Sequence, residues 1–206
     1  MDFTAFALSQ LPPPPGRILE LGCGESGGIT PALDAAGYDA VGVDPSAPEG
    51  RLYRRAMLDD LDGELFDAVV AERVLHHVHP LAPGVDRLAR LAPLLVLDEF
   101  DREQIDDAAQ AWYESQHRLL VAAGREPHGP AELDPWRKRH PDLHSTTTMR
   151  AALARRFEER LFERRPYLYR WLDGPASESL EESLVAAGAI PAIGFRWVGV
   201  RAGERR

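Results

Sequence analysis

The sequence predicts an α/β fold, in which an open sheet of mostly parallel strands carries helices on both faces. Three observations lead to this prediction. Short apolar runs alternate with segments of helical periodicity, a glycine-rich turn joins the first apolar run to the first helix, and 206 residues suffice for one such domain. Strand–helix–strand crossovers of this kind are right-handed and make neighbouring strands parallel.

The first half of the chain repeats the pattern most clearly. Glycine at 37 ends the first helix, and Asp44 ends the second strand. The run LLVL at 94–97 is apolar at every position, which is typical of a strand buried on both faces. The predicted elements are strand 18–21, turn 22–28, helix 29–36, strand 40–43, strand 67–71, helix 81–91 and strand 94–97.

The second half is less regular. Asp101 and Gln104 resemble a capping box, and apolar residues then recur at helical spacing, with Trp112 expected in the core. The predicted elements are helix 102–123, a long loop 125–144 that could act as a lid, a helix from Ser145 or Thr146 to about 157, strand 158–165, helix 178–187 and strand 195–201.

We expect one domain with an additional N-terminal segment and an insertion. Residues 1–15 form an N-terminal segment that ends in a stiff proline spacer at Pro12 to Pro15. Residues 16–206 form the single domain, with a helical and loop insertion at about 102–157.

The amino-acid composition favours some classes of binding partner over others. The net charge of −9 disfavours a broad nucleic-acid surface, so a small molecule is the better expectation. The segment 125–170 holds eleven Lys or Arg against seven Asp or Glu. This excess of basic residues predicts either a solvated, arginine-rich face or a surface that binds an anionic acceptor. Because Cys23 is the one cysteine of the sequence, it cannot form an intramolecular disulfide or a thiolate metal cluster. With neither a membrane-spanning apolar run nor a signal peptide in the sequence, we expect a cytoplasmic protein that does not bind membranes.

Acidic residues flank the glycine turn. Gly22, Gly24 and Gly27 fit the dinucleotide pattern G-x-G-x-x-G, so a nicotinamide cofactor stays an alternative. Glu20 at the end of the first strand would repel a pyrophosphate but would suit S-adenosylmethionine (SAM), which carries an ammonium and a sulfonium. Asp44 can accept hydrogen bonds from the ribose of either cofactor.

Several segments resemble the class I SAM-dependent methyltransferases. ILELGCGESGG is similar to the family's first motif, VGVDPS to its acidic second-strand end, FDAVVAERVLHHV to its fourth-strand segment, LLVLDEF to its fifth strand and GFRWVGVRAG to its last. The resemblance covers about residues 16–203, with the stronger motifs before Phe100. It implies a Rossmann-like, doubly wound sheet of seven mostly parallel strands with an antiparallel last strand.

The resemblance also implies a cofactor site. Glu20 would hold the SAM amino group, directly or through water, and Asp44 the ribose. The adenine would lie against AMLDDL, and the sulfonium end beside the residues that follow the fourth strand. The implied site residues are Glu20, Gly22, Cys23, Gly24, Asp44, Pro45, Met57, Leu58, Asp59, Glu72 and Leu75.

Two positions depart from the family pattern. Its third glycine falls at Ser26, with Gly27 one place later, and Met57 stands where many relatives have an acid. We expect these departures to move the loop slightly and either to weaken the adenine contact or to shift it to Asp59.

The expected activity is methyl transfer from SAM to a small acceptor, with S-adenosylhomocysteine (SAH) as the product. Such a displacement needs no acid for the leaving group, and a base only for a protonated acceptor. His76 and His77 are the candidate bases, no metal is expected, and Asp98 and Glu99 are expected to face the acceptor or cofactor. Alternatives are a non-catalytic SAM-binding or partner-binding protein on the same fold and, less favoured, a nicotinamide-dependent oxidoreductase. The acceptor and the oligomeric state are left open.

Overall fold

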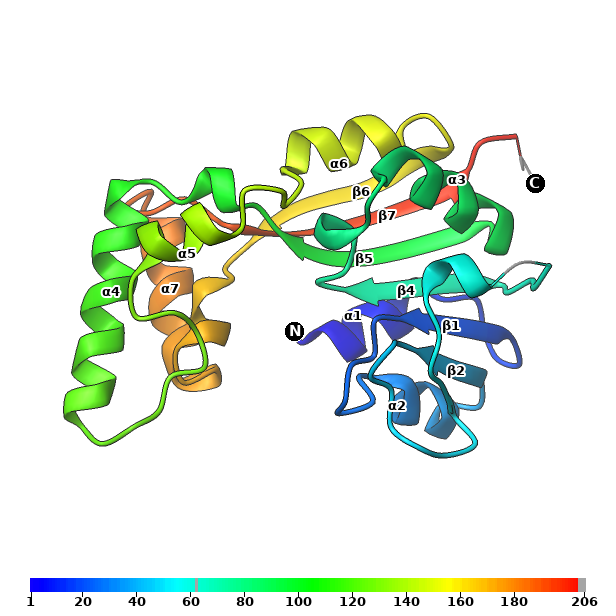
Figure 1. Ribbon diagram of the computed structural model, residues 1–206, viewed down its shortest axis with the longest axis horizontal. Helices are drawn as coiled ribbons and strands as arrows, with labels where there is room; N and C mark the ends of the chain where they lie inside the picture. The colour runs from blue at the N-terminus through cyan, green and yellow to red at the C-terminus, as the bar shows by residue number, and fades with distance from the viewer. Residues whose placement is uncertain (62, 204–206) are drawn as a thin grey trace. The chain divides into compact units, whose positions relative to one another are not determined.

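The computed structural model describes residues 1–61 and 63–203 and contains a seven-stranded sheet (Figure 1). Its order is β3-β2-β1-β4-β5-β7-β6. The pairs among β1 to β5 are parallel. The strands are β1 (Arg17–Leu21), β2 (Asp39–Val43), β3 (Tyr53–Arg54), β4 (Ala68–Glu72), β5 (Leu94–Phe100), β6 (Phe157–Arg165) and β7 (Gly194–Arg201).

The last strand, β7, runs antiparallel to β5. The backbone of Arg201 donates to Pro93 at one end of the pair, and that of Asp101 donates to Ile193 at the other. The predicted sheet of mostly parallel strands with an antiparallel last strand is therefore confirmed.

Helices connect the strands. They are α1 (Phe3–Gln10), α2 (Thr30–Ala35), α3 (Leu81–Leu91), α4 (Asp107–Ala122), α5 (Leu133–Arg139), α6 (Thr146–Leu153) and α7 (Pro175–Ala186). Four short 3-10 turns are η1 (Leu58–Asp60), η2 (Leu75–His77), η3 (Arg102–Gln104) and η4 (Leu168–Trp171). In the described part of the chain, none of the helices is long and apolar enough to cross a membrane.

The chain divides into two compact units. The first comprises Met1–Glu99, Thr147–Phe162 and the chain from Arg196 onward, and the second comprises Phe100–Thr146 and Glu163–Phe195. The first unit therefore holds the glycine turn and every predicted cofactor residue.

The core of the first unit lies between α1, α2 and one face of the sheet. Phe6 of α1 and Leu33 of α2 are buried in one cluster with Ile18, Val70 and Val96 of the strands. The N-terminal segment thus contributes a core helix, which Asp2 caps by accepting from the amide of Ala5 at 2.8 Å. This packing fixes β1 and α2, and with them both ends of the glycine turn.

The second unit has an aromatic core of its own. Phe100 stacks on Tyr167 with ring centroids 4.5 Å apart, and Trp171 lies edge-on 5.5 Å from Phe100 and 4.9 Å from Trp136. Tyr113 of α4 is fully buried, and its hydroxyl donates to Pro130 at 2.7 Å.

Three predictions for this unit were wrong in detail. The expected helix 102–123 begins only at Asp107, because Asp101 caps the short turn η3 while Asp106 caps α4 by accepting from Ala109. Tyr113 of that helix is buried, whereas Trp112 is half-buried and packs against the edge of the aromatic core. The expected loop 125–144 contains the helix α5.

Candidate cofactor site

Acidic side chains lie at the carboxyl ends of neighbouring parallel strands. Glu20 of β1 is in register with Gly42 of β2 and Val70 of β4, and Glu72 at the end of β4 is in register with Asp98 of β5. Asp44 follows β2 directly. Ligands of open α/β sheets bind at this edge, so the topology brings the predicted acids to one place.

Glu20 is buried against the start of α2. Its carboxylate accepts from the amide of Ile29 at 2.9 Å and from the hydroxyl of Thr30 at 2.5 Å, and the residue is 2% exposed. Burial raises the pKa of Glu20, the hydrogen bonds from Thr30 and Ile29 oppose the rise, and the charge of Glu72 adds to it. Glu20 therefore holds the turn in place and interacts electrostatically with Glu72.

The glycine turn passes close over this carboxylate. Gly28 has a φ of +55°, and a Cβ there would collide with the carboxylate of Glu20. Gly24 has a φ of +61°, and a Cβ built there meets no described atom within 4 Å. The turn is thus tight on its inner side and open beside Gly24, where a ligand could approach the backbone.

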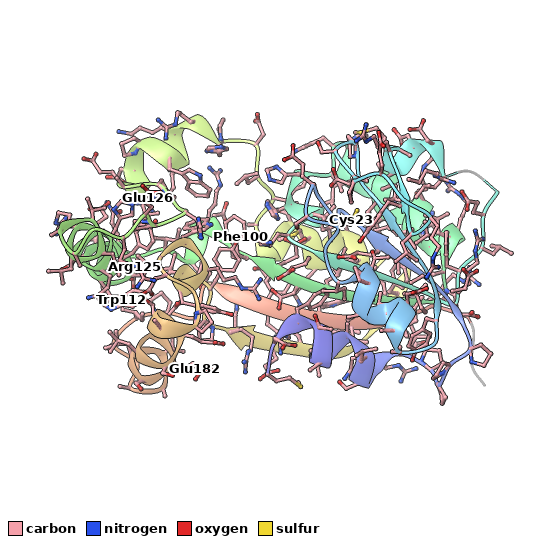
Figure 2. The ribbon with its side chains drawn as sticks, turned by 90° about the horizontal axis from the view of Figure 1, so that it is seen from below. Cys23, Phe100, Trp112, Arg125, Glu126 and Glu182 are labelled. Carbon is pink, nitrogen blue, oxygen red and sulfur yellow. The ribbon has the colours of Figure 1, made fainter. Side chains whose placement is uncertain are left out.

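Cys23, marked in Figure 2, lies between Gly22 and Gly24 and is 3% exposed. Burial, together with the charges of Glu20 and Asp44, raises the pKa of Cys23 to about 11. A buried thiol of this kind packs as a small apolar group. Both carboxylates are therefore close enough to Cys23 to act on the thiol electrostatically.

Asp44 begins a turn after β2. Its Oδ1 accepts from the amide of Ser46 at 2.7 Å, and Pro45 between them is exposed. In the described residues, the other oxygen of Asp44 accepts no hydrogen bond from the chain. One carboxylate oxygen therefore fixes the turn while the other can face a ligand.

The predicted adenine segment forms the turn η1. Met57 is 59% exposed, and its amide donates to Asp60 at 2.8 Å. Leu58 is half-buried, and the exposed Asp59 is 3.3 Å from the guanidinium of Arg87. The position of Met57 therefore leaves an apolar side chain at the surface beside the acidic edge.

Glu72, Leu75 and the two histidines follow β4. Leu75 and His76 are buried, whereas His77 is exposed, and the two imidazole rings are 4.2 Å apart. Only His76 of the pair is fixed in the interior, and its Nδ1 is 2.5 Å from Oε2 of Glu99.

Glu99 organises this loop from β5. Its Oε1 accepts from the amide of Val74 at 2.8 Å and from that of Leu75 at 2.5 Å, while Oε2 contacts His76. The side chain is fully buried. The carboxylate of Glu99 thus holds both the backbone after β4 and the imidazole of His76 in position.

The expectation that Asp98 and Glu99 face a ligand was wrong. Asp98 is 4% exposed, and its carboxylate accepts from Nε of Arg196 at 3.0 Å. Arg196 also donates to the backbone of Met1 at 2.8 Å and lies over the ring of Phe6. The sequence shows two acids at a strand end but not the arginine, 98 positions away along the chain, that pairs with one of them.

Four residues expected in a lid belong to the second unit. His128 is exposed, His140 and His144 are half-buried, and Trp136 packs in the aromatic core of that unit. Trp136 also stacks on His140 with ring centroids 5.0 Å apart. Across the described residues, there is no group of three or more His, Cys, Asp or Glu that could hold a metal.

Comparison with solved structures shows the fold. A SAM-dependent methyltransferase from Mesorhizobium loti is 20% identical, with 96% of each chain covered and a TM-score of 0.60. A putative SAM-dependent methyltransferase from Listeria monocytogenes is 14% identical, covering 96% of this chain and 95% of its own, also at 0.60. Magnesium protoporphyrin IX methyltransferase from Synechocystis, solved with bound SAH, is 18% identical, covering 97% and 80% at 0.55.

No curated protein sequence matches the chain. The family model described as a methyltransferase domain matches residues 1–163, which include the whole acidic edge and the glycine turn. The solved structures share the fold in which that edge is built. The chain belongs to the methyltransferase domain family.

Proposed function

We propose that the chain binds SAM at the carboxyl ends of β1, β2 and β4 and transfers its methyl group to a small-molecule acceptor. The supporting observation is the group of three carboxylates, Glu20, Asp44 and Glu72, around a glycine turn that has open space beside it. A ligand with an ammonium, a sulfonium and a ribose diol is favoured by such a group, whereas a pyrophosphate would be repelled.

The chemistry of the residues fits this cofactor. Asp44 offers a carboxylate oxygen to the ribose hydroxyls while its other oxygen holds the amide of Ser46. Glu20 and Glu72 supply negative charge near the glycine turn for the ammonium, with Glu20 acting directly or through water. Gly22, Cys23 and Gly24 would pack against the methionine part, and Pro45, Met57, Leu58 and Asp59 would flank the adenosine.

The bound cofactor would supply an activated methyl group whose leaving group is a neutral thioether. Alignment and exclusion of water then account for most of the catalysis. The chain contributes the loop after β4, where Glu99 fixes the amides of Val74 and Leu75 and the ring of His76. His76 or His77 would take a proton where the acceptor is a hydroxyl or another protonated nucleophile.

Titration calorimetry with SAH tests the proposal. Asp44→Asn keeps an oxygen for the amide of Ser46 but replaces the other oxygen with a donor, which cannot accept from a ribose hydroxyl. We expect SAH to bind the wild type and to bind Asp44→Asn about tenfold to hundredfold more weakly.

The matched control is Asp39→Asn, which removes an exposed carboxylate at the other end of the same strand. It should leave the SAH affinity unchanged. Failure of the wild type to bind SAH at millimolar concentration, or equal affinities of the two variants, would contradict the proposed site.

A further inference from the structure

A cavity in the first unit is lined mainly by arginines. It has a volume of about 480 Å³ and is bounded by Asp86 and Arg90 of α3, by Arg155 and Arg156 before β6, and by Arg201 at the end of β7, with two alanines. Figure 1 shows α3, the start of β6 and the end of β7 together at one end of the sheet. This is the amino end of β5, whereas the glycine turn lies at the carboxyl ends of the parallel strands.

Backbone hydrogen bonds hold the three segments in place. The amide of Arg201 donates to Pro93 at 2.7 Å, and the amide of Ala202 donates to Arg156 at 2.8 Å. The guanidinium of Arg201 also donates to the carbonyl of Ala89 at 2.7 Å, near the end of α3. The arginines therefore project from a fixed frame, which reduces the entropy lost when a ligand binds.

The cavity carries an excess of positive charge. Nε of Arg156 lies 2.6 Å from the carboxylate of Asp86. That hydrogen bond is the main cause of the lowered pKa of Asp86, and the charges of Arg155 and Arg90 lower it further. Four guanidinium groups and one carboxylate leave three positive charges in a chain whose net charge is −9.

Two of the arginines have side chains available for a ligand. Arg90 and Arg155 are exposed, and neither makes an ion pair with any described residue. A guanidinium presents a planar fork of N–H donors that matches the oxygens of a phosphate. A cavity of this volume is in the range that holds small organic ligands.

We propose that this cavity binds a small molecule through a diphosphate group, at a site separate from the cofactor site. Each phosphate group carries roughly −1.5 to −2 charges at neutral pH. A diphosphate, with a charge of about −3, therefore balances the excess positive charge of the cavity. Each of its two phosphate groups can accept hydrogen bonds from one guanidinium, that of Arg90 or that of Arg155. Free pyrophosphate and a nucleoside diphosphate share this chemistry.

The test is titration calorimetry of the full chain with sodium pyrophosphate and, separately, with ADP. The double variant Arg90→Ala/Arg155→Ala removes the two unpaired guanidiniums, and because both are exposed the fold should survive. The matched control Arg118→Ala/Arg125→Ala removes two exposed arginines elsewhere and changes the net charge equally. Thermal unfolding followed by circular dichroism checks that all three proteins are folded.

We expect saturable binding of at least one ligand to the wild type and to the control, and at least tenfold weaker binding to Arg90→Ala/Arg155→Ala. Tighter binding of ADP than of pyrophosphate would support a nucleoside diphosphate, and the reverse order would support the free ion. No saturable binding by the wild type would overturn the proposal, as would equal losses in the two double variants. Much tighter binding of a short RNA than of either ligand would also overturn it, in favour of a nucleic-acid surface.

Discussion

Three buried glutamates, Glu20, Glu99 and Glu181, perform the same structural task. Each is at most 2% exposed and accepts hydrogen bonds from backbone amides at the start of a short helix or turn. The first amides of a helix have no partner within it, and its amino end carries partial positive charge, so a carboxylate satisfies both needs. Two of these glutamates, Glu20 and Glu99, hold the segments that form the candidate site.

Glu99 should also determine the tautomer of His76. Because the carboxylate faces Nδ1, we expect that nitrogen to carry the proton, which leaves the lone pair on Nε2. Glu99→Gln keeps an oxygen for the amides of Val74 and Leu75 but turns an amide donor toward Nδ1. The imidazole should then change to the tautomer protonated at Nε2, which long-range proton–nitrogen NMR spectra distinguish.

The control for this experiment is Glu103→Gln, at an exposed position on η3. It should leave the imidazole signals of His76 as they are in the wild type. The same tautomer of His76 in the wild type and in Glu99→Gln would show that Glu99 does not position the ring.

Cys23 should be a slow nucleophile. Its pKa is raised to about 11 from an ordinary value of 9.0, so at pH 8 the thiolate fraction falls about a hundredfold. A disulfide reagent such as DTNB should therefore react with the native protein about a hundredfold more slowly than with the urea-unfolded chain. Because the sequence has one cysteine, the signal needs no assignment. Native and unfolded rates within a few-fold of each other would contradict the burial of this thiol.

At the scale of elements, Glu181 joins α7 to the turn η4. Its Oε1 accepts from the amides of Tyr167 and Leu168 at 2.8 and 3.0 Å, and Oε2 accepts from that of Tyr169 at 2.6 Å. The amides lie beside the aromatic core of the second unit. Loss of the carboxylate would remove or weaken these three hydrogen bonds.

We predict that Glu181→Gln lowers the free energy of unfolding by about 2 kcal/mol and speeds hydrogen exchange at the amides of Tyr167 and Tyr169. Burial raises the pKa of Glu181 above the ordinary 4.5, and the three amides only partly oppose this. The folded state therefore binds the proton more tightly than the unfolded state. The stabilisation that the wild type gains from this shift is complete below pH 4.5 and is lost as the pH rises through the raised pKa. The unfolding free energy that Glu181→Gln loses relative to the wild type should therefore be larger at pH 5 than at pH 8.

The neighbouring Glu182 provides the control, because it is exposed on the same helix (Figure 2). Glu182→Gln should change the urea midpoint little at either pH. Equal urea midpoints for the two variants would contradict the role proposed for Glu181. So would a loss of unfolding free energy in Glu181→Gln that grows as the pH rises.

The elements that the sequence predicted best are those with local signals. Helix α3 has the predicted bounds, β1, β2 and β7 begin one residue earlier than predicted, and β4 is shifted by one residue at both ends. Apolar runs mark these elements in the sequence. Helix α4 was placed wrongly because two aspartates five residues apart can each cap a helix. The interior of the second unit, not the local pattern, decides that Asp106 begins α4.

For the whole molecule, the sequence predicted the places of Glu20 and Asp44 in the sheet better than the contacts of Asp98, Glu99 and Glu181. Glu20 lies near the carboxyl end of one apolar strand and Asp44 directly follows the next, so parallel topology alone brings them to one edge. The partners of Asp98, Glu99 and Glu181 come from distant positions, and no local signal reveals a contact between them. The division into two compact units was not visible in the sequence either, since the second unit is built from two separate stretches of chain.

We infer that the acidic edge of the sheet is built for a ligand with a cationic end and a ribose diol. A crystal structure of the chain with SAH tests it most directly. We predict that the SAH ammonium lies on the side of Glu20 and Glu72, directly or through one water, and that the ribose hydroxyls donate to Asp44. SAH bound elsewhere, or bound here with the ribose away from Asp44, would contradict the account.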